Sequence, residues 1–203
     1  DVLAMRAVLY SSEDGGYVDN VAGASLSGNH RNDDPGYNVV DENQNKYGTT
    51  GGRIAFALDL NENWNALLTV VAENSELDGT WETDPLLGDH KVTRFIDENR
   101  EDEWYATALT VEGDLGFANL TVSASHFERD IAYNWDNDAY TQYKDRYYGN
   151  GYNAYGYYYG LYNTDYNRSF IFNDQSQERD TVEIRLVSQS DSRLQWTAGL
   201  FYE

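Results

Sequence analysis

Residues 52–74 read GRIAFALDLNENWNALLTVVAEN, and this stretch decides the fold. In its first half, Ile54, Phe56 and Leu58 alternate with Arg53, alanines and Asp59. Alternation with a period of two is typical of a β-strand with one apolar face. Residues 61–63, Asn-Glu-Asn, supply the side chains that tight turns favour. The stretch therefore predicts an antiparallel β-hairpin.

The hairpin pattern recurs along the whole chain. Seven strands are expected, at 1–11, 52–60, 64–74, 103–112, 116–130, 179–190 and 194–203. Their connections alternate between tight turns and long polar loops, the turns at 61–63, 113–115 and 191–193 and the loops at 12–51, 75–102 and 131–178. An up-and-down transmembrane β-barrel produces this alternation, because its periplasmic turns are short and its external loops are long. We therefore predict an all-β, antiparallel transmembrane barrel segment, with the three turns on one rim and the three loops on the other.

The alternation also predicts which side chains face lipid. The apolar row, expected on the outside, comprises Ile54, Phe56, Leu58, Leu120, Val122, Ile184, Leu186, Ala198 and Leu200. The row expected to face the interior comprises Arg53, Asp59, Asn119, Thr121, Ser123, Glu183, Arg185 and Gln195. Trp64, Trp104 and Phe117 lie near expected strand ends, where the aromatic rings of membrane barrels gather.

Composition excludes several classes of function. The chain has no cysteine, so it has neither a disulfide framework nor thiolate chemistry. Its formal charge of −21 at pH 7 argues against nucleic acid, which requires a basic footprint. It has no run of about 18 apolar residues that would form a transmembrane helix. The sequence starts at Asp1 without a signal peptide, so such a peptide was removed or the sequence starts internally.

No pattern of catalytic or metal-ligating residues is present. Without a nucleophile elbow, a P-loop or a dinucleotide fingerprint, we expect neither an enzyme nor a cofactor. His30, His90 and His126 occupy separate expected elements, and no metal site is predicted. Asp136-Asn137-Asp138 begins like a calcium loop, but the next ligand and the glycine are replaced. A solvated acidic face is expected there and at 97–103 instead.

The third loop has an unusual composition. From Tyr133 to Tyr166 it holds 12 of the chain's 18 tyrosines, interleaved with glycine and asparagine. Tyrosine offers a flat apolar ring and a hydroxyl at a low entropy cost, which suits a recognition surface. The candidate ligand-binding residues are Trp135, Tyr147, Tyr148, Tyr152, Tyr157, Tyr158 and Tyr159. The alternative is a low-complexity loop that packs on its neighbours or on lipopolysaccharide.

Two groups of residues carry a resemblance to a known family. The stretch TVEIRLVS at 181–188, followed by LQWTAGLFY at 194–202, is similar to a hairpin of the form E-(I/L)-R-L-x-S … W-x-x-G-x-F-Y. Arg6-Ala7, the run GGYVDN at 15–20 and Gly52-Arg53 are similar, in order and spacing, to the first barrel strands that follow a plug. Together they resemble the β-barrel of the TonB-dependent outer-membrane receptors over nearly the whole chain.

The resemblance implies a location, partners and a transport function. Members of this family have an N-terminal plug, a TonB-binding segment and a barrel of about 22 strands. Residues 1–203 would form one partial barrel domain in the first third of that barrel, because seven strands are an odd number and an open sheet in lipid leaves two unpaired edges. The implied setting is the bacterial outer membrane, with contacts to lipid and lipopolysaccharide. The TonB complex would act through a plug that these residues lack, and would drive the import of a scarce small-molecule nutrient.

The ligand stays open at this point. Iron–siderophore complexes, cobalamin and oligosaccharides all use such barrels, and a fold does not identify a ligand. The alternative function is that of a secreted all-β carbohydrate-binding module, with the Tyr-rich loop as its stacking platform. A plug upstream and further hairpins downstream would favour transport.

Overall fold

The protein is built around one long antiparallel sheet. The computed structural model describes residues 2–25, 31–140, 169–189 and 193–203. The sheet has the order β1-β6-β7-β9-β10-β11-β12, so every long strand pairs with the next long strand along the chain. The strands are β1 (Leu3–Asp14), β6 (Tyr47–Asn61), β7 (Trp64–Asp78), β9 (Asn99–Asp114), β10 (Ala118–Asp136), β11 (Phe170–Ser188) and β12 (Thr197–Tyr202). The predicted all-β, antiparallel, up-and-down arrangement of seven long strands is confirmed.

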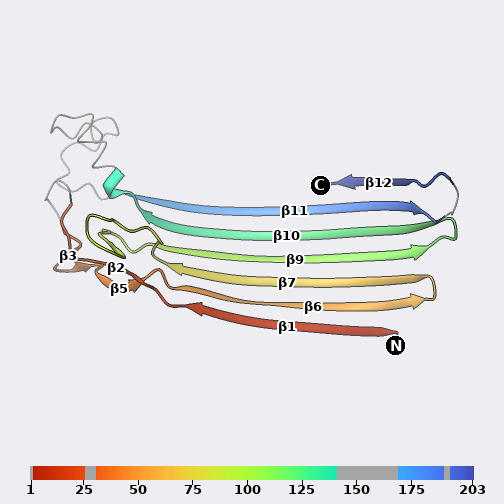
Figure 1. Cartoon of the computed structure of the whole chain (residues 1–203), viewed down its shortest axis with the longest axis horizontal. Coiled ribbons are helices and arrows are strands. Elements are labelled where there is room, and N and C mark those ends of the chain that lie inside the picture. The colour runs from red at the N-terminus through yellow and green to blue at the C-terminus, as the bar shows by residue number, and fades with distance from the viewer. Residues whose placement is uncertain (1, 26–30, 141–168, 190–192) are drawn as a thin grey trace.

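The tight connections lie at one end of the sheet and the long loops at the other (Figure 1). The amide of Asp114 donates to the carbonyl of Asn63, with an N···O distance of 2.9 Å, and so joins the first turn to the second. The amide of Gln189 donates to the carbonyl of Phe117 at 3.1 Å, which places the third connection beside the second. The prediction that the turns share one rim is confirmed for 61–63 and 113–115, whereas the predicted third turn, 191–193, lies largely outside the described residues.

Most of the long strands extend further toward the loops than the sequence predicts. β6 begins at Tyr47 instead of residue 52, and β11 begins at Phe170 instead of residue 179. The added residues show no alternation of apolar and polar side chains, because those of β6 are mostly small or polar, whereas β11 opens with three consecutive apolar residues, Phe170, Ile171 and Phe172. They are nevertheless paired in continuous register, for example Tyr47 with Leu77 and Asp136 with Phe170.

Five short strands, which the sequence does not predict, organise the first two loops. β2 (Val18–Asn20) pairs with β5 (Asp41–Gln44) in antiparallel fashion and with β8 (Lys91–Val92) in parallel fashion. β3 (Asp33–Asp34) and β4 (Tyr37–Asn38) form a separate hairpin. Strands of two to four residues are too short to show a periodicity, which is why the sequence does not reveal them. The buried apolar residues gather mainly in this layer and include Val18, Val39, Val92 and Phe95.

The strand register assigns each side chain of the long sheet to one of two faces. Directly opposed residues lie on the same face, as in the row formed by Met5, Phe56, Leu68 and Leu109. All nine residues of the predicted apolar row share this face, which we call the leucine face. The opposite face carries Arg53, Asp59, Asn119, Thr121, Ser123, Glu183 and Arg185, and we call it the arginine face. Gln195, which was predicted to join them, precedes β12 and belongs to neither face.

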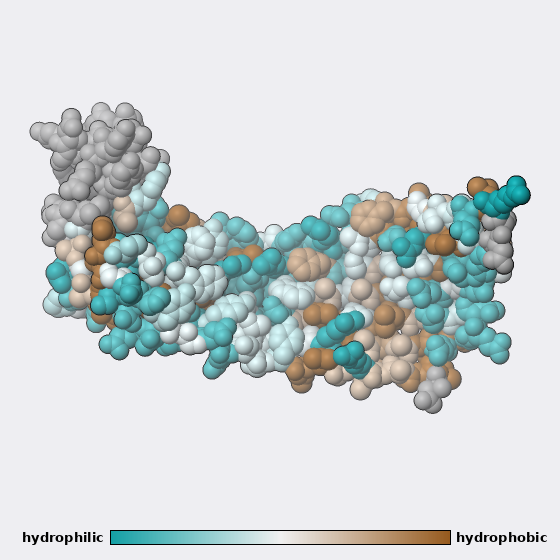
Figure 2. Space-filling view, viewed as in Figure 1, coloured by the Kyte–Doolittle hydropathy of each residue, from teal (hydrophilic) through white to brown (hydrophobic). Residues whose placement is uncertain are grey.

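The leucine face is apolar toward the turns and acidic toward the loops. Its apolar side chains are open, with Leu9 at 88%, Leu200 at 77% and Met5 at 64% relative exposure. Figure 2 presents one face of the molecule, on which hydrophobic and hydrophilic residues are mixed over the turn half of the sheet and the half toward the loops is mostly teal and white. We call the apolar part of this face, from Leu3 to Leu9 on β1 and across the sheet to Ala198 and Leu200 on β12, the apolar band. Among the described residues, no helix is long and apolar enough to cross a membrane.

Gly113 near the turn end is fixed by an aromatic ring on the neighbouring strand. It pairs directly with Trp64, and a Cβ atom at this glycine would lie 2.5 Å from two carbons of the indole. The ring therefore covers the backbone of β9 at a place where only glycine fits.

Replacing Gly113 with alanine should destabilise the protein by about 1–3 kcal/mol, the usual cost of overpacking. Gly48→Ala on β6 is the matched control, because its added Cβ would meet no atom within 4 Å. The free energy of unfolding in detergent, followed by tryptophan fluorescence, measures both variants. Equal stability of the two variants would show that the indole does not hold this position.

Candidate functional site

A network of buried asparagines joins the first loop to the second. Asn20 and Asn32 have relative exposures of 1% and 0%. The amide nitrogen of Asn20 donates to the carbonyl of Val39 at 2.6 Å, and that of Asn32 donates to the carbonyl of Arg94 at 3.1 Å. In return, the backbone amide of Arg94 donates to the side-chain oxygen of Asn20 at 2.8 Å. Satisfied buried polar networks of this kind hold loops in one arrangement.

Three carboxylates fix the base of the third loop, and two of them also join it to the second loop. The carboxylate of Glu98 accepts from the backbone amide of Asp136 at 2.9 Å. The carboxylate of Asp136 in turn accepts from the amide of Phe95 at 2.5 Å, and that of Asp138 accepts from the amide of Ser169 at 3.1 Å. We call Glu98, Asp136 and Asp138 the carboxylate clip. The expectation of a solvated acidic face at Asp136-Asn137-Asp138 is wrong for its two aspartates, because backbone amides bind both carboxylates and Asp138 is only 1% exposed.

Burial shifts the pKa of two carboxyls of the clip. Burial raises the pKa of Glu98 above its usual range, although the nearby guanidinium of Arg94 acts in the opposite direction. Burial also raises the pKa of Asp136, against the lowering effect of the amides of Phe95 and Asp138. Arg94 is held by a second carboxylate as well, that of Glu82, with an N···O distance of 2.7 Å.

Trp135 lies on the arginine face of β10, one residue before Asp136 of the clip. Its ring stacks on that of Tyr133, with centroids 4.4 Å apart and planes tilted by 31°. Tyr133 is directly opposed by Arg100 on β9 and by Asn173 on β11. We call Tyr133 and Trp135 the aromatic shelf. Since Trp135 remains 38% exposed, the shelf offers a ring surface at the loop end of the arginine face.

The polar neighbours of the shelf can add hydrogen bonds to stacking. Asp102 holds the guanidinium groups of Arg129 at 2.6 Å and Arg100 at 2.8 Å. The side-chain oxygen of Asn173 is buried and has no hydrogen-bond partner within the described part of the chain. The rings and the guanidinium groups form a surface suited to binding, and none of these side chains is arranged as a nucleophile and base.

Only one predicted ligand-binding residue can be placed. Trp135 lies on the shelf, whereas Tyr147, Tyr148, Tyr152, Tyr157, Tyr158 and Tyr159 fall outside the described residues. Tyr133, Arg100 and Asn173 were not predicted as site residues. Tyr133 could have been found from its spacing of two from Trp135, which places both on one face of a strand. Arg100 and Asn173 required the strand register.

The structure also gathers a group of possible metal ligands on the leucine face. Ligand atoms of His126, Glu178 and Asp180 lie within 4.8 Å of one another. His126 directly opposes Asp180, with Nδ1 at 2.8 Å from the carboxylate, and the hydroxyl of Tyr105 lies 3.2 Å from Nε2. The expectation that no metal site is present rested on the separate positions of the three histidines. Pairing the expected strands 116–130 and 179–190 in register would have revealed the carboxylates.

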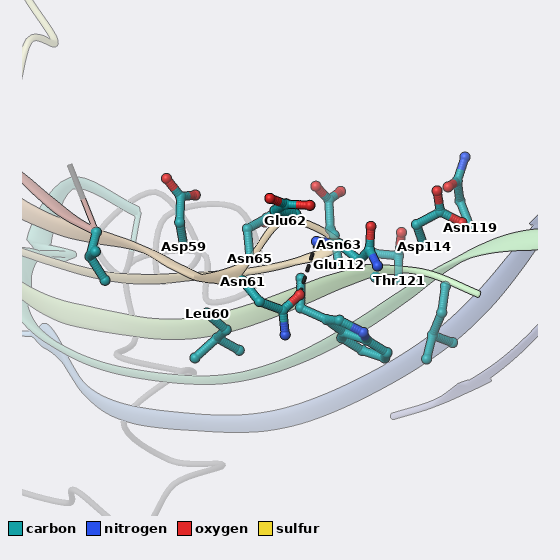
Figure 3. Close-up of a pocket in the computed structure, with 14 residues that line it drawn as sticks. Asp59, Leu60, Asn61, Glu62, Asn63, Asn65, Glu112, Asp114, Asn119 and Thr121 are labelled. Carbon is teal, nitrogen blue, oxygen red and sulfur yellow. Dashed lines mark hydrogen bonds between the residues drawn. The ribbon is translucent and has the colours of Figure 1, made fainter. Parts of the chain in front are cut away.

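A polar groove of about 920 Å³ lies at the turn end, far from the shelf. It is lined by acids and amides of the first two turns and the strands beside them, among them Asp59, Glu62, Asn65 and Glu112. Figure 3 shows the side chains of Asp59 and Leu60 pointing to opposite sides of the sheet, as the alternation requires. The groove therefore carries its charge on the arginine face.

Comparison with known protein families, with curated proteins and with solved structures finds no match.

The raised pKa values predict how the attachment of the third loop depends on pH. A buried carboxyl whose pKa is higher in the folded state favours folding below its unfolded pKa, and this contribution is lost as the pH rises through the folded pKa. The opening free energy at the Asp136 amide, from hydrogen exchange corrected for intrinsic rates, should therefore increase as the pH falls from neutral into the acid range.

Glu98→Gln should weaken this pH dependence, because it removes one of the two buried titrating groups. Glu82→Gln is the matched control, since Glu82 also contacts Arg94 but its side chain is 79% exposed. A decrease of the opening free energy on acidification, or an equal effect of both variants, would contradict the assignment to Glu98.

Proposed function

We propose that this chain forms part of the barrel wall of a TonB-dependent outer-membrane receptor, which binds a scarce nutrient and imports it with TonB-derived energy. The observation that carries the proposal is the apolar band, which runs across all seven long strands and is covered by no described residue. An exposed apolar surface of this extent is unusual on a soluble monomer and marks contact with a membrane or a partner. The arginine face behind the band is polar and in places charged, as the interior of a membrane barrel requires.

The height of the band supports a bilayer as its environment. On β6 the band extends from Gly52 to Leu60, which is eight residue steps or about 26 Å along the strand. At a strand tilt of about 40° this corresponds to a height of about 20 Å, near the apolar height of about 25 Å of outer-membrane barrels. β10 and β11 each have 19 residues, well above the 9–11 that cross a bilayer. Their excess lies at the loop end, where it would extend beyond the membrane.

The proposal requires further strands and a plug. In the described sheet, β1 and β12 each have one edge without a neighbouring strand. In hydrocarbon such an edge leaves unpaired backbone groups that cost several kcal/mol each. Additional strands, about 22 in all in the family that the sequence resembles, would satisfy both edges. A plug would provide the contact with the TonB complex.

Ligand capture would take place at the loop end. The aromatic shelf and the Tyr-rich loop, whose base the carboxylate clip fixes, supply rings for stacking on a sugar or on an aromatic chelating group. Iron–siderophore, cobalamin and oligosaccharide ligands all fit this chemistry. A secreted carbohydrate-binding module could use the same rings, but it would need another layer over the whole apolar band.

A pair of arginine substitutions tests the membrane assignment. Leu120 lies level with Trp64 and Asn61 at the turn-side edge of the apolar band, so Leu120→Arg should destabilise the membrane-inserted protein by about 1 kcal/mol, the cost of an arginine near the membrane interface. Thr121→Arg is the matched control, because it adds the same charge one residue away on the arginine face. Unfolding in lipid vesicles measures both. If the two variants are equally stable, the apolar band does not face lipid.

Deletion of residues 147–160 tests the role of the Tyr-rich loop. The intact receptor should lose at least tenfold in ligand affinity and a comparable fraction of uptake, because several stacking rings are removed. Heat-modified gel mobility checks that the shortened protein still inserts as a barrel. A correctly inserted barrel that binds its ligand as tightly as the parent would show that the tyrosines form a coat or packing surface instead.

A further inference from the structure

The arginines of the long sheet all lie on one face. The register places Arg6, Arg53, Arg100, Arg129, Arg179 and Arg185 on the arginine face. No lysine or arginine lies on the leucine face of the seven long strands. A chain with 35 acidic and 14 basic residues thus directs every basic side chain of its main sheet to the same side.

Four of these six arginines lie within 4.0 Å of a carboxylate. Arg129 and Arg100 bind Asp102, Arg179 lies 3.2 Å from Glu203, and Arg185 lies 3.9 Å from Glu183. Arg6 and Arg53 are different, because no carboxylate of the described residues lies within 4.0 Å of either guanidinium. In so acidic a chain, two unpaired arginines side by side are unexpected.

The two unpaired arginines flank one small hollow. Arg6 is directly opposed by Ala55 and Arg53 by Val8, so the guanidinium groups start from diagonal positions on neighbouring strands. These four residues line a hollow of about 120 Å³. A water molecule takes up about 30 Å³ in the liquid, so the hollow can hold a group of several heavy atoms. The next residues on this face, Ala4 and Ala57, are small and leave access from above the sheet.

The chemistry of the pair points to an oxyanion. Two cations on diagonal positions of neighbouring strands repel each other unless an anion lies between them. Each guanidinium presents a planar fork of donors that matches the two oxygens of a carboxylate or a phosphate. Arg6 and Arg53 also lie at the height of the apolar band, since Ala7 and Ile54 beside them belong to it.

We propose that Arg6 and Arg53 form a binding site for a carboxylate or phosphate group on the arginine face. In a barrel this face is the interior, so the site would hold an anionic nutrient on its way through the barrel. The statement about passage rests on the proposed function, whereas the anion site itself does not. The same chemistry can be supplied by a free anion or by an acidic side chain from elsewhere in the intact protein.

Anion binding by the intact protein in detergent micelles tests the site. The probes are citrate, inorganic phosphate and, as a neutral control, maltose, measured by calorimetry and by the side-chain NMR signals of ¹⁵N-labelled arginine. Citrate or phosphate should shift the signals of Arg6 and Arg53. The double variant Arg6→Gln/Arg53→Gln should bind them at least about tenfold more weakly, the effect expected from losing charge-assisted hydrogen bonds. Arg185→Gln is the matched control on the same face and should change affinity by less than about twofold.

The possible results distinguish three cases, namely a free anion, an internal carboxylate and the absence of an anion site. Binding that depends on Arg6 and Arg53 supports a free-anion site. Absence of binding, together with strongly protected guanidinium protons and lower stability of the double variant, supports a site filled by an internal carboxylate. Absence of binding with freely exchanging guanidinium protons overturns the proposal, as does binding that is unchanged in the double variant. If the Leu120→Arg test fails while anion binding still needs both arginines, the proposed function falls and the site remains.

Discussion

The continuous hydrogen-bond ladder through the seven long strands is the constraint on which the rest of the structure depends. Because opposed residues share a face, fixing one pair of strands in register fixes the side of every residue on the next strand. A shift of one residue between β10 and β11 would place Glu183 and Arg185 beside Leu120 and Val122. Such a shift would move charged side chains into the apolar band. The alternation of apolar and polar residues and the strand register therefore stabilise each other.

The part of the fold that could be predicted from the sequence is the part where this coupling acts. Ile54, Leu120 and Ile184 alternate with polar residues, and their shared face follows from that alternation. The loop-side half of the sheet could not be predicted, because Glu101, Glu103 and Glu178 on one face stand beside Asp102 and Arg179 on the other. In the loop-side half, the backbone hydrogen bonds continue in the register of the turn-side half, although no apolar row marks the strands. The asparagine network of Asn20 and Asn32 could not be predicted either, because it joins residues that are distant in sequence, Asn20 at the end of a three-residue strand and Asn32 just before a two-residue strand.

The candidate site shows the same division. Trp135 stays a predicted ligand-binding residue, chosen because clustered rings suit a recognition surface. Arg100 and Asn173 could not be chosen in this way, because they lie on other strands and oppose its stacking partner Tyr133 only through the register. The group formed by His126, Glu178 and Asp180 could not be found along the sequence for the same reason, since Asp180 lies 54 positions from His126 in sequence yet directly opposite it in the sheet. For a sheet protein, a site is therefore best sought along rows of paired strands instead of along the chain.

The proposed barrel gives a reason for the sorting of charge between the two faces. On the leucine face, Glu128 directly opposes Glu178 and Glu76 directly opposes Glu101, and directly opposed like charges destabilise a sheet. Water and salt reduce this repulsion where the strands extend beyond the apolar band. The arginines would gain the same solvation there, yet none is found on that face. On the arginine face a guanidinium can reach a carboxylate on its own or a neighbouring strand, as Arg129 reaches Asp102, so a cation is retained where a confined anion can meet it. Arg6 and Arg53 follow this rule only if their anion is one that the described chain does not supply.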